Sequence, residues 1–318
     1  MGDPGSWPSS DRAAGCRRGR RGAGSVGGPV RLVAVVPATS ANLGPGFDCF
    51  GLALDLVNEV TLDPEAAPGV SWEGEGAGEL PTDGSDALSA ALRRTAQVAG
   101  RRLPPLRLHG RNRIPVERGL GSSAAAVVAG VGLADRLLGL GLSADDRLAL
   151  AVELEGHPDN VAAALRGGLV LAYRGAGGWR AEALAPAEGL RPAVLVPDAR
   201  LSTVAARAAL PRAVPLVDAA FNAGRAALAV VALTARPELL AEALEDRLHQ
   251  EVRLRLVPEV AETFARVRAA GIPVCVSGAG PSLLAFEREG AAVPDLGPGW
   301  RVLRVPPRRT GLEVEEAP

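Results

Sequence analysis

Apolar residues recur along the chain with two spacings, one typical of strands and one typical of helices. Short runs rich in β-branched residues predict strands, and the first, at 30–36, is expected to end at Pro37. Further strands are predicted at 58–62, 70–72, 106–108, 169–173, 192–196, 272–276, 283–286 and 302–305. Apolar residues three and four positions apart predict helices at 85–99, 122–138, 143–155, 202–210, 216–233, 238–248 and 260–270. This mixture of strands and helices favours an α+β protein of two lobes.

Composition divides the chain into four parts. Residues 1–29 are mostly Gly, Ser, Pro and Arg and lack the apolar core of a signal peptide, so we interpret them as a disordered tail. With 318 residues the chain is long enough for two domains, which we expect at 30–180 and 190–306. Residues 307–318 are polar and acidic and are expected to form a flexible tail.

The charged residues narrow the possible chemistry. The chain contains no lysine, so all 35 basic residues are arginine. This excludes a P-loop lysine, the strand lysine of protein kinases and Schiff-base chemistry. A phosphate site in this chain must therefore use a helix dipole, a metal ion or arginine.

The remaining composition points away from several classes of partner. A formal net charge of −1 gives no overall field that favours nucleic acid or a membrane surface. No uninterrupted apolar run reaches about 18 residues, so no membrane span is expected. Cys16, Cys49 and Cys275 lie far apart in sequence, which favours a reducing cytoplasm over a disulfide framework or a zinc site.

The most distinctive stretch runs from Ile114 to Ala126, IPVERGLGSSAAA, and predicts a glycine-rich loop leading directly into a helix. Ser122 or Ser123 is expected to cap the first turn, and Gly139 to end the helix. The first N–H groups of such a helix have no internal partner, so a phosphate can bind there. The alternative is a buried helix that merely begins with a tight glycine turn.

Three further blocks stand in a fixed order around this loop. They are VPATSANLGPGFD at 36–48, ELEGHPDN at 153–160 and VSGAGPSLL at 276–284. Together the four blocks resemble the GHMP small-molecule kinases, and among these the homoserine kinases, over 30–306. The resemblance implies a two-domain α+β fold. Its N-terminal lobe would be like ribosomal protein S5 domain 2, its C-terminal lobe ferredoxin-like, with the active site between them.

The resemblance also implies an activity and a nucleotide site. We expect ATP- and Mg²⁺-dependent phosphorylation of the hydroxyl of L-homoserine, in threonine biosynthesis, by a homodimer. Other GHMP small-alcohol kinases and a catalytically silent ligand-binding protein of the same fold are the alternatives. The expected nucleotide-binding residues are those of the glycine loop: Ile114, Pro115, Val116, Glu117, Arg118, Gly119, Leu120, Gly121, Ser122, Ser123 and Ala124.

Two hard oxygen ligands are expected to hold Mg²⁺. The resemblance favours Ser123 and Glu153, with Glu155 as the rival because the spacing around it is ambiguous. A helical carboxylate taken alone is more often a solvated surface residue.

Substrate-binding residues are expected in three of the blocks and in the second half of the chain. The resemblance assigns this role to Asn42, Asp48, His157, Asn160, Arg207, Arg253, Gly278 and Gly280. An amino-acid carboxylate favours planar arginine donors, which gives Arg207 and Arg253 their place. Arg253 follows HQEV where the family usually has HEPY. Without the resemblance, the first two residues would be turn formers and each arginine a surface residue.

Asp159 and Asn160 are the expected catalytic residues. Asp159 stands where some GHMP kinases have a catalytic aspartate, and Asn160 suits a hydrogen bond to the substrate's amino or hydroxyl group. The alternative for Asp159 is a helix cap or an orienting role. If no base acts, the substrate hydroxyl can pass its proton to a γ-phosphate oxygen.

Overall fold

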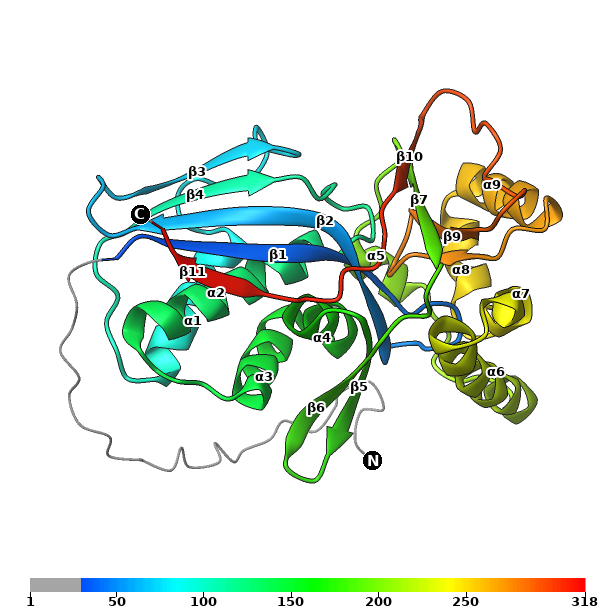
Figure 1. Cartoon of the computed structure of the whole chain (residues 1–318), viewed down its shortest axis with the longest axis horizontal. Helices are drawn as coiled ribbons and strands as arrows, with labels where there is room; N and C mark the ends of the chain where they lie inside the picture. The colour runs from blue at the N-terminus through cyan, green and yellow to red at the C-terminus, as the bar shows by residue number, and fades with distance from the viewer. Residues whose placement is uncertain (1–29, 318) are drawn as a thin grey trace.

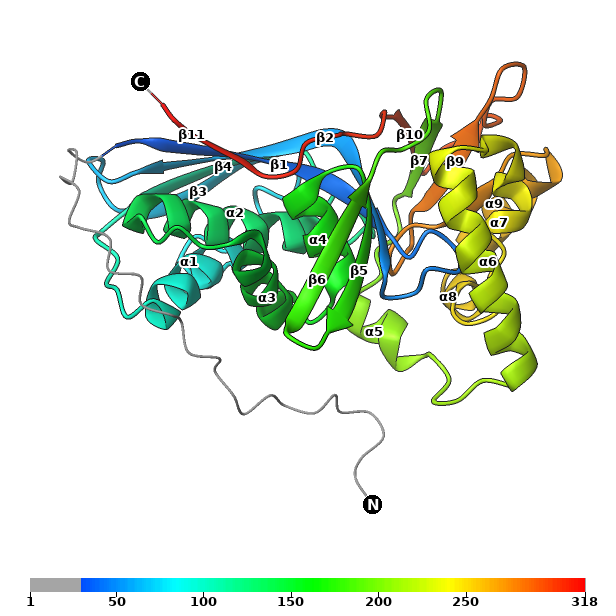
Figure 2. The same ribbon diagram turned by 60° about the horizontal axis from the view of Figure 1, so that its bottom comes forward.

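A computed structural model describes residues 30–317. The predicted tail at 1–29 lies outside these residues, so that prediction is not addressed. The N-terminal lobe is built on a seven-stranded sheet in the order β11-β1-β2-β4-β3, with β5 paired to β2 and β6 paired to β5. Four helices pack on one face of this sheet (Figures 1 and 2). The elements are β1 (Leu32–Ala41), β2 (Phe50–Asp63), β3 (Gly69–Gly74), α1 (Ala87–Val98), β4 (Arg107–Asn112), α2 (Ser122–Leu138), α3 (Ala144–Glu155), α4 (Pro158–Arg166), β5 (Leu169–Gly175), β6 (Gly178–Leu184) and β11 (Glu313–Glu316).

The C-terminal lobe is built on a four-stranded sheet in the order β10-β7-β9-β8. Its elements are β7 (Arg191–Pro197), α5 (Thr203–Ala208), α6 (Leu216–Thr234), the short 3-10 turn η1 (Pro237–Leu239), α7 (Leu240–Ala243), α8 (Gln250–Leu256), α9 (Pro258–Ala269), β8 (Val274–Val276), β9 (Leu283–Glu287) and β10 (Trp300–Arg304). Alternate residues of β7 and β9 face two separate cores. One core holds Val194 and Leu284 and continues into the N-terminal lobe, and the other holds Leu195 and Leu283 with α9 residues. The expected α+β architecture of two lobes is confirmed.

The first strand does not end at Pro37. It continues to Ala41, and its pairing with β2 shifts register between Pro37 and Ala38. A proline has no N–H for the ladder, and a bulge is one of the few places where a strand accepts it. The extra residues bring Thr39 and Ser40 to the end of the strand that faces the glycine loop.

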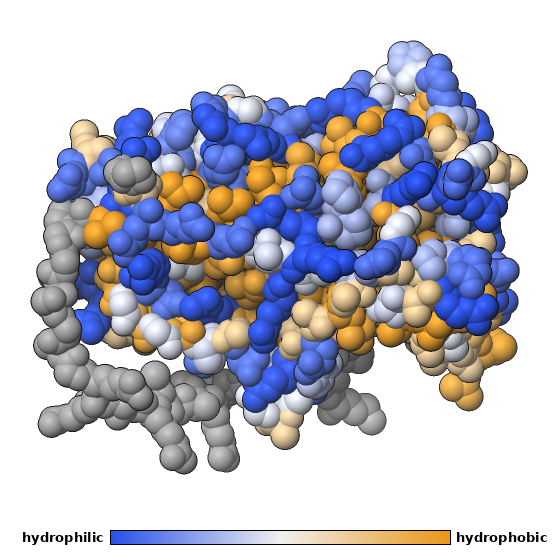
Figure 3. All heavy atoms as spheres, in the orientation of Figure 1, coloured by the Kyte–Doolittle hydropathy of each residue, from blue (hydrophilic) through white to orange (hydrophobic). Residues whose placement is uncertain are grey.

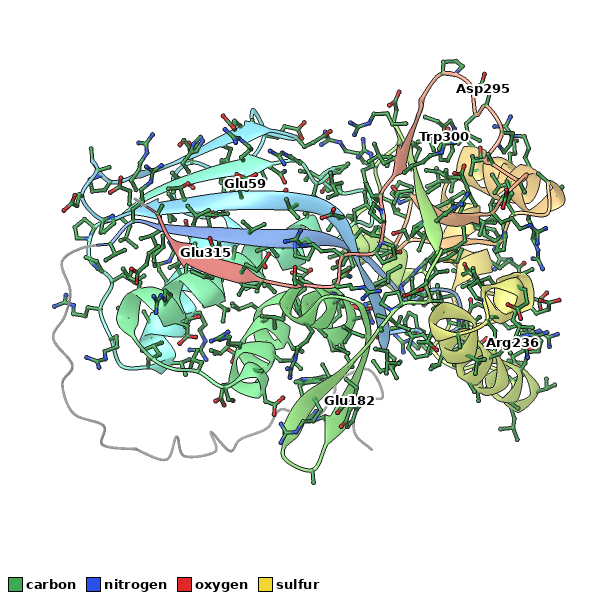
Figure 4. All side chains as sticks on the ribbon, in the orientation of Figure 1. Glu59, Glu182, Arg236, Asp295, Trp300 and Glu315 are labelled. Carbon is green, nitrogen blue, oxygen red and sulfur yellow. The ribbon has the colours of Figure 1, made fainter. Side chains whose placement is uncertain are left out.

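The C-terminal segment is not the flexible tail that the sequence predicts. Residues 313–316 form β11, an antiparallel edge strand that pairs with β1, and Figure 1 shows it in red beside the blue β1. The N–H of Arg308 also donates to the carbonyl of Ala53 at 2.9 Å. Three of the four side chains of β11 are glutamates, and the fourth, Val314, packs against the core of the lobe. Figure 4 shows Glu315 and Glu59 along this sheet.

The predicted helix at 238–248 is interrupted. After α7 ends, the buried carboxylate of Asp246 accepts hydrogen bonds from the N–H groups of Leu248, His249 and Gln250, at 3.1, 2.9 and 2.7 Å. An aspartate that bonds nearby backbone groups in this way competes with continued helix. The turn begins a new helix, α8, which carries His249 at its start and Arg253 one turn later.

The surface viewed in Figure 3 is mostly hydrophilic, with hydrophobic side chains between the charged ones. Of the helices in the described part of the chain, α6 alone has the length and hydropathy (1.5) of a membrane-crossing segment. The charged residues Asp218 and Arg225 interrupt it. A single helix of this kind is weak support for a span, and the expected absence of one stays a prediction.

Candidate active site

The glycine loop and the start of α2 form the centre of the candidate site. The helix begins at Ser122 as predicted, but its N-cap is Gly121, in the left-handed conformation with φ 69°, and no side chain caps the turn. The predicted serine cap is therefore wrong. The first helical bond joins the Ala125 N–H to the Gly121 carbonyl, so the N–H groups of residues 122–124 have no acceptor within the helix. The predicted end at Gly139 is confirmed.

Close contacts with other blocks explain why two positions in the loop are glycine. A Cβ on Gly119 would lie 2.2 Å from the carbonyl oxygen of Ser277, and one on Gly121 would lie 2.0 Å from Oγ1 of Thr39. The hydroxyl of Ser277 lies 2.8 Å from the carbonyl oxygen of Gly119 and 2.8 Å from the hydroxyl of Ser40. A Cβ on Gly121 would also lie 3.1 Å from Oδ1 of Asn160, so all four sequence blocks meet at this loop.

A cavity of 460 Å³ opens beside the loop. Every predicted nucleotide-binding residue from Pro115 to Ser123 lines it. Ile114 and Ala124, at the two ends of the predicted set, are instead fully buried in the core. Their side chains do not line the cavity because the chain turns inward at both ends of the loop, and their part in nucleotide binding stays a prediction.

Arg118 lines the cavity, but its guanidinium is already occupied. Nε donates to the carbonyl of Pro197 at 2.9 Å, Nη2 to that of Asp198 at 2.8 Å, and Nη1 to that of Val116 at 3.2 Å. Arg118 therefore fastens the loop to the end of β7 in the other lobe.

The predicted metal pair does not occur in the structure. Glu153 points away from the loop and forms an ion pair with Arg94 of α1, with Nε and Oε1 2.8 Å apart. Glu155, the rival, accepts a hydrogen bond from the hydroxyl of Ser123 at 2.8 Å and lines the cavity. Two positions on a helix differ by about 200° in direction, so the two carboxylates cannot face the same loop. Burial raises the pKa of Glu155, and the hydrogen bond from the hydroxyl of Ser123 partly offsets this.

Charged residues from three different segments meet beyond the loop. The guanidinium of Arg207, on α5, forms a bidentate pair with Asp48, with nitrogen–oxygen distances of 2.9 and 2.6 Å. The guanidinium carbons of Arg207 and Arg253 lie 5.6 and 5.4 Å from the centre of the Phe47 ring. Burial, with Arg207 nearby, lowers the pKa of Arg253 to about 10, so it remains charged at neutral pH. The structure therefore brings together the two arginines and the aspartate predicted to bind substrate.

Asn42, Gly278 and Gly280 belong to the framework around these charges. The side-chain amide of Asn42 donates to the carbonyl of Gly278 at 2.8 Å, and its oxygen accepts from the N–H of Asp48 at 3.0 Å. Gly278 and Gly280 both adopt positive φ, at 56° and 85°. The alternative interpretation of Asn42, as a turn former that satisfies backbone groups, describes these contacts.

The start of α4 supplies the remaining predicted residues. His157 is its N-cap, and His157 and Asn160 line the cavity. Asn160 accepts a hydrogen bond from the hydroxyl of Thr39 at 2.8 Å. Asp159 is not the cap of this helix, and its oxygen accepts from the N–H of Asn160 at 2.7 Å. Burial, followed by the negative charge of Asp48, raises the pKa of Asp159 to about 7.

Comparison with known proteins assigns the chain to a family. Residues 86–168 match the GHMP kinases N terminal domain, and residues 225–293 match the GHMP kinases C terminal domain. A homoserine kinase from Streptomyces avermitilis is 47% identical over 88% of this chain and 94% of its own length. The chain belongs to the homoserine kinase family of GHMP kinases.

Two other members of the homoserine kinase family support this assignment. A homoserine kinase from Clavibacter michiganensis is 49% identical over 80% of this chain and 82% of its own length. The crystal structure of homoserine kinase from Cytophaga hutchinsonii has a TM-score of 0.75 at 26% identity, covering 92% of this chain and 99% of that one. The similarity therefore extends over both lobes.

Sequence reasoning missed one wall of the cavity. This wall comes from β2, β3, β4 and the loop before α1, and holds Asn58, Trp72, Leu80, Pro81 and Asn112. The indole N–H of Trp72 donates to the carbonyl of Pro81 at 2.8 Å, which leaves the ring beside the cavity. The only signal was a tryptophan in a short polar strand, a residue whose ring and N–H both need a partner.

Proposed function

We propose that the protein transfers the γ-phosphoryl group of ATP to the hydroxyl of L-homoserine, giving O-phospho-L-homoserine and ADP in threonine biosynthesis. The observation that carries the choice of substrate is the group formed by Asp48, Arg207 and Arg253 around Phe47, beside the loop. An amino acid offers a carboxylate to the arginines and an ammonium group to the aspartate. A sugar or a neutral alcohol offers neither charge.

The glycine loop is suited to hold the triphosphate of ATP. The N–H groups of Ser122 and Ser123, which have no acceptor within the helix, and the positive end of the α2 dipole lie at the cavity. The glycines leave room for a phosphate to approach the backbone. Because the arginine of the loop is occupied by carbonyl groups, these N–H groups supply the positive potential.

Mg²⁺ fits the donors at the mouth of this loop. Ser123 and Glu155 present a hydroxyl and a partly buried carboxylate, which are hard oxygen ligands. No cluster of three or more His, Cys, Asp or Glu suited to a metal occurs between residues 30 and 317. Mg²⁺ in kinases often uses one or two protein oxygens together with phosphate oxygens and water. A bound Mg²⁺ would neutralise charge that develops on the phosphate oxygens.

The proton of the substrate hydroxyl passes to a γ-phosphate oxygen in this proposal. Asp159 is not among the residues that line the cavity, and one of its oxygens already accepts from the N–H of Asn160. Its role is to orient Asn160, whose amide faces the cavity. Phosphoryl transfer then depends on positioning and on charge stabilisation.

A cytoplasmic homodimer is part of the same proposal. Cys49 and Cys275 are free thiols, in keeping with a reducing compartment. Leu216 and Val217 at the start of α6 are 84% and 67% exposed, which is unusual for large apolar side chains. Light scattering on the purified protein would give the oligomeric state.

The substrate is tested by following ADP release from ATP and Mg²⁺ with L-homoserine, L-serine, L-threonine, mevalonate and galactose. We expect strong preference for L-homoserine. Replacing Arg207 by Ala removes a bidentate charged donor and should lower kcat/KM for L-homoserine by about 100-fold. Arg212→Ala, in an exposed position five residues later, is the matched control and should stay within about twofold.

Each other result has a defined meaning. Turnover of a different alcohol would overturn the substrate while leaving the family intact. ATP binding without turnover of any alcohol would favour the catalytically silent protein. Equal losses in the two arginine variants would refute the carboxylate-binding role of Arg207.

A further inference from the structure

His249 is a buried histidine beside the substrate-binding arginines, and its side chain is only 1% exposed. Its ring lies 5.2 Å from that of Phe47, between centroids. Nε2 lies 2.8 Å from the carbonyl oxygen of Gly44, and Nδ1 lies 3.1 Å from Nη1 of Arg253. Both ring nitrogens therefore have a partner, and one of these partners is an arginine assigned to the substrate.

These partners determine which nitrogen carries the proton. A carbonyl oxygen only accepts, so Nε2 must be the donor; a guanidinium only donates, so Nδ1 must be the acceptor. His249 is thus the neutral Nε2–H tautomer. Burial lowers the pKa of His249 to about 4; the negative charge of Asp246 opposes this shift and the positive charge of Arg253 adds to it, so the ring is neutral at physiological pH.

The bonds of Arg253 divide its guanidinium into an occupied and a free part. Nη1 donates both to Nδ1 of His249 and to the carbonyl of Gly278, the latter at 2.6 Å. Nε is buried and has no partner among the described residues. Nε and Nη2 form one of the two edges on which a guanidinium binds a carboxylate with two parallel bonds. The side chain is 4% exposed, so an unpaired donor there is costly unless a ligand satisfies it.

The backbone of His249 is held as firmly as its ring. The carboxylate of Asp246 accepts from the N–H groups of His249 and Gln250, and also from the side-chain amide of Asn222 at 2.9 Å. The side chain of Gln250 in turn accepts from the N–H of Val276, just before the loop that carries Gly278. One set of hydrogen bonds therefore fixes both His249 and the loop that carries Gly278, whose carbonyl accepts from Arg253.

We propose that His249 is a positioning residue, which accepts one bond from Nη1 of Arg253 and so directs the Nε–Nη2 edge toward the substrate carboxylate. This inference rests on the proposed function, because it assumes an amino-acid substrate. This role differs from that of a buried ring that only stabilises the fold. The lone pair on Nδ1 affects substrate binding, whereas the hydrogen bond from Nε2–H to Gly44 stabilises the fold.

Two substitutions separate these two nitrogens. Asn places its oxygen as far along the side chain as Nδ1, and Gln places its amide nitrogen as far along as Nε2. His249→Gln should therefore keep the bond to Gly44 and lose the acceptor for Arg253, raising KM for L-homoserine at least about tenfold with little change in KM for ATP. His249→Asn should keep KM for L-homoserine within about threefold of the unmutated chain, although it leaves more empty volume.

A substrate without the carboxylate gives the decisive control. With 3-aminopropan-1-ol, kcat/KM should be the same in the unmutated chain and in both variants, since no carboxylate is present for Arg253. His109→Gln, the same change at a half-exposed histidine on β4, should leave kcat/KM unchanged for both substrates. Equal effects of the Gln and Asn variants, or equal effects on both alcohols, would overturn the positioning role.

A second measurement tests the geometry without activity. The chain has only three histidines, so the ¹⁵N signals of the His249 ring can be assigned with the help of the two variants. We expect Nε2 protonated and Nδ1 unprotonated between about pH 6 and 8. A proton on Nδ1 would refute the inference even if the variants fail to fold. Failure of the proposed function is a different result, namely no L-homoserine-dependent ADP release by the unmutated chain.

Discussion

Replacing Asp159 by Asn should stabilise the protein, and more so at higher pH. Asp159 is 3% exposed, and burial raises its pKa from 3.8 to about 7. As the pH rises between these two values, the unfolded chain ionises at this position while the folded chain keeps its proton. Ionisation then favours the unfolded state, so stability is lost across this window and the loss is constant above it.

The size of the effect follows from the shift in pKa. A shift of one unit corresponds to about 1.4 kcal/mol, so the penalty is about 2 kcal/mol at about pH 5 and about 4 kcal/mol at about pH 8. Asn has no such penalty. Its side-chain oxygen can still accept the N–H of Asn160, which is the one close bond that Asp159 makes to the backbone. Asp159→Asn should therefore unfold at higher urea concentration, by a margin that doubles between the two pH values.

Urea unfolding at the two pH values measures this margin. Glu262→Gln, at an exposed position on α9, is the control and should change stability by less than about 0.5 kcal/mol at both. The reasoning is refuted if Asp159→Asn has the same effect at both pH values, because a gain from packing alone does not depend on pH. In Asp159→Asn, kcat should fall by less than about tenfold, because Asp159 is not the general base in the proposed function. Loss of a general base would lower kcat about 100-fold or more.

Two further predictions concern the glycine loop. Glu155→Gln should lower kcat/KM at least about 100-fold in the ADP-release assay, whereas Glu153→Gln should stay within about twofold; the reverse order would restore the metal pair first expected from the sequence. Gly121→Ala places a Cβ 2.0 Å from Oγ1 of Thr39, at a residue whose φ is 69°, and should destabilise the protein by about 1–3 kcal/mol in urea unfolding. The control is Gly78→Ala, whose added Cβ meets nothing within 4 Å and which should change stability by less than about 0.5 kcal/mol. If Gly121→Ala left the stability unchanged, the tight approach of β1 to the loop would be contradicted.

The sequence predicts the glycine loop well because its physical requirements are local. Small residues after the glycines predict a helix from Ser122, and a left-handed glycine after the last turn predicts its end at Gly139, although the residue types pointed to a serine N-cap and the structure has Gly121 there. The carboxylate opposite this loop cannot be predicted in the same way. Whether Glu153 or Glu155 faces Ser123 depends on how α3 is rotated against α1 and α2, and that rotation is decided by packing far from either residue.

Two other errors have the same origin in distant contacts. The helix predicted at 238–248 has good helical spacing, but Asp246 finds backbone N–H groups and the amide of Asn222 as partners and ends it. Residues 313–316 carry only one apolar residue, Val314, which is too weak a signal to predict a strand; the segment is held as an edge strand by backbone bonds to β1 and by the packing of Val314 against the core. Patterns of apolar residues do not encode either arrangement.

The closed pair of Asp48 and Arg207 bears on specificity in a way that pocket shape does not. A ligand that binds Arg207 separates it from Asp48, and Asp48 then needs another cation. The side chains of Asp48 and Arg207 are only 30% and 40% exposed, so a charge left without a partner there is unfavourable. In the proposed complex, a zwitterionic amino acid would replace both partners at once, with its carboxylate on the arginine and its ammonium group on the aspartate. A neutral alcohol breaks the pair and replaces neither. On the proposed function, the ion pair would disfavour uncharged alcohols by the same contacts that accept an amino acid, which is how discrimination between substrates of similar size is often obtained.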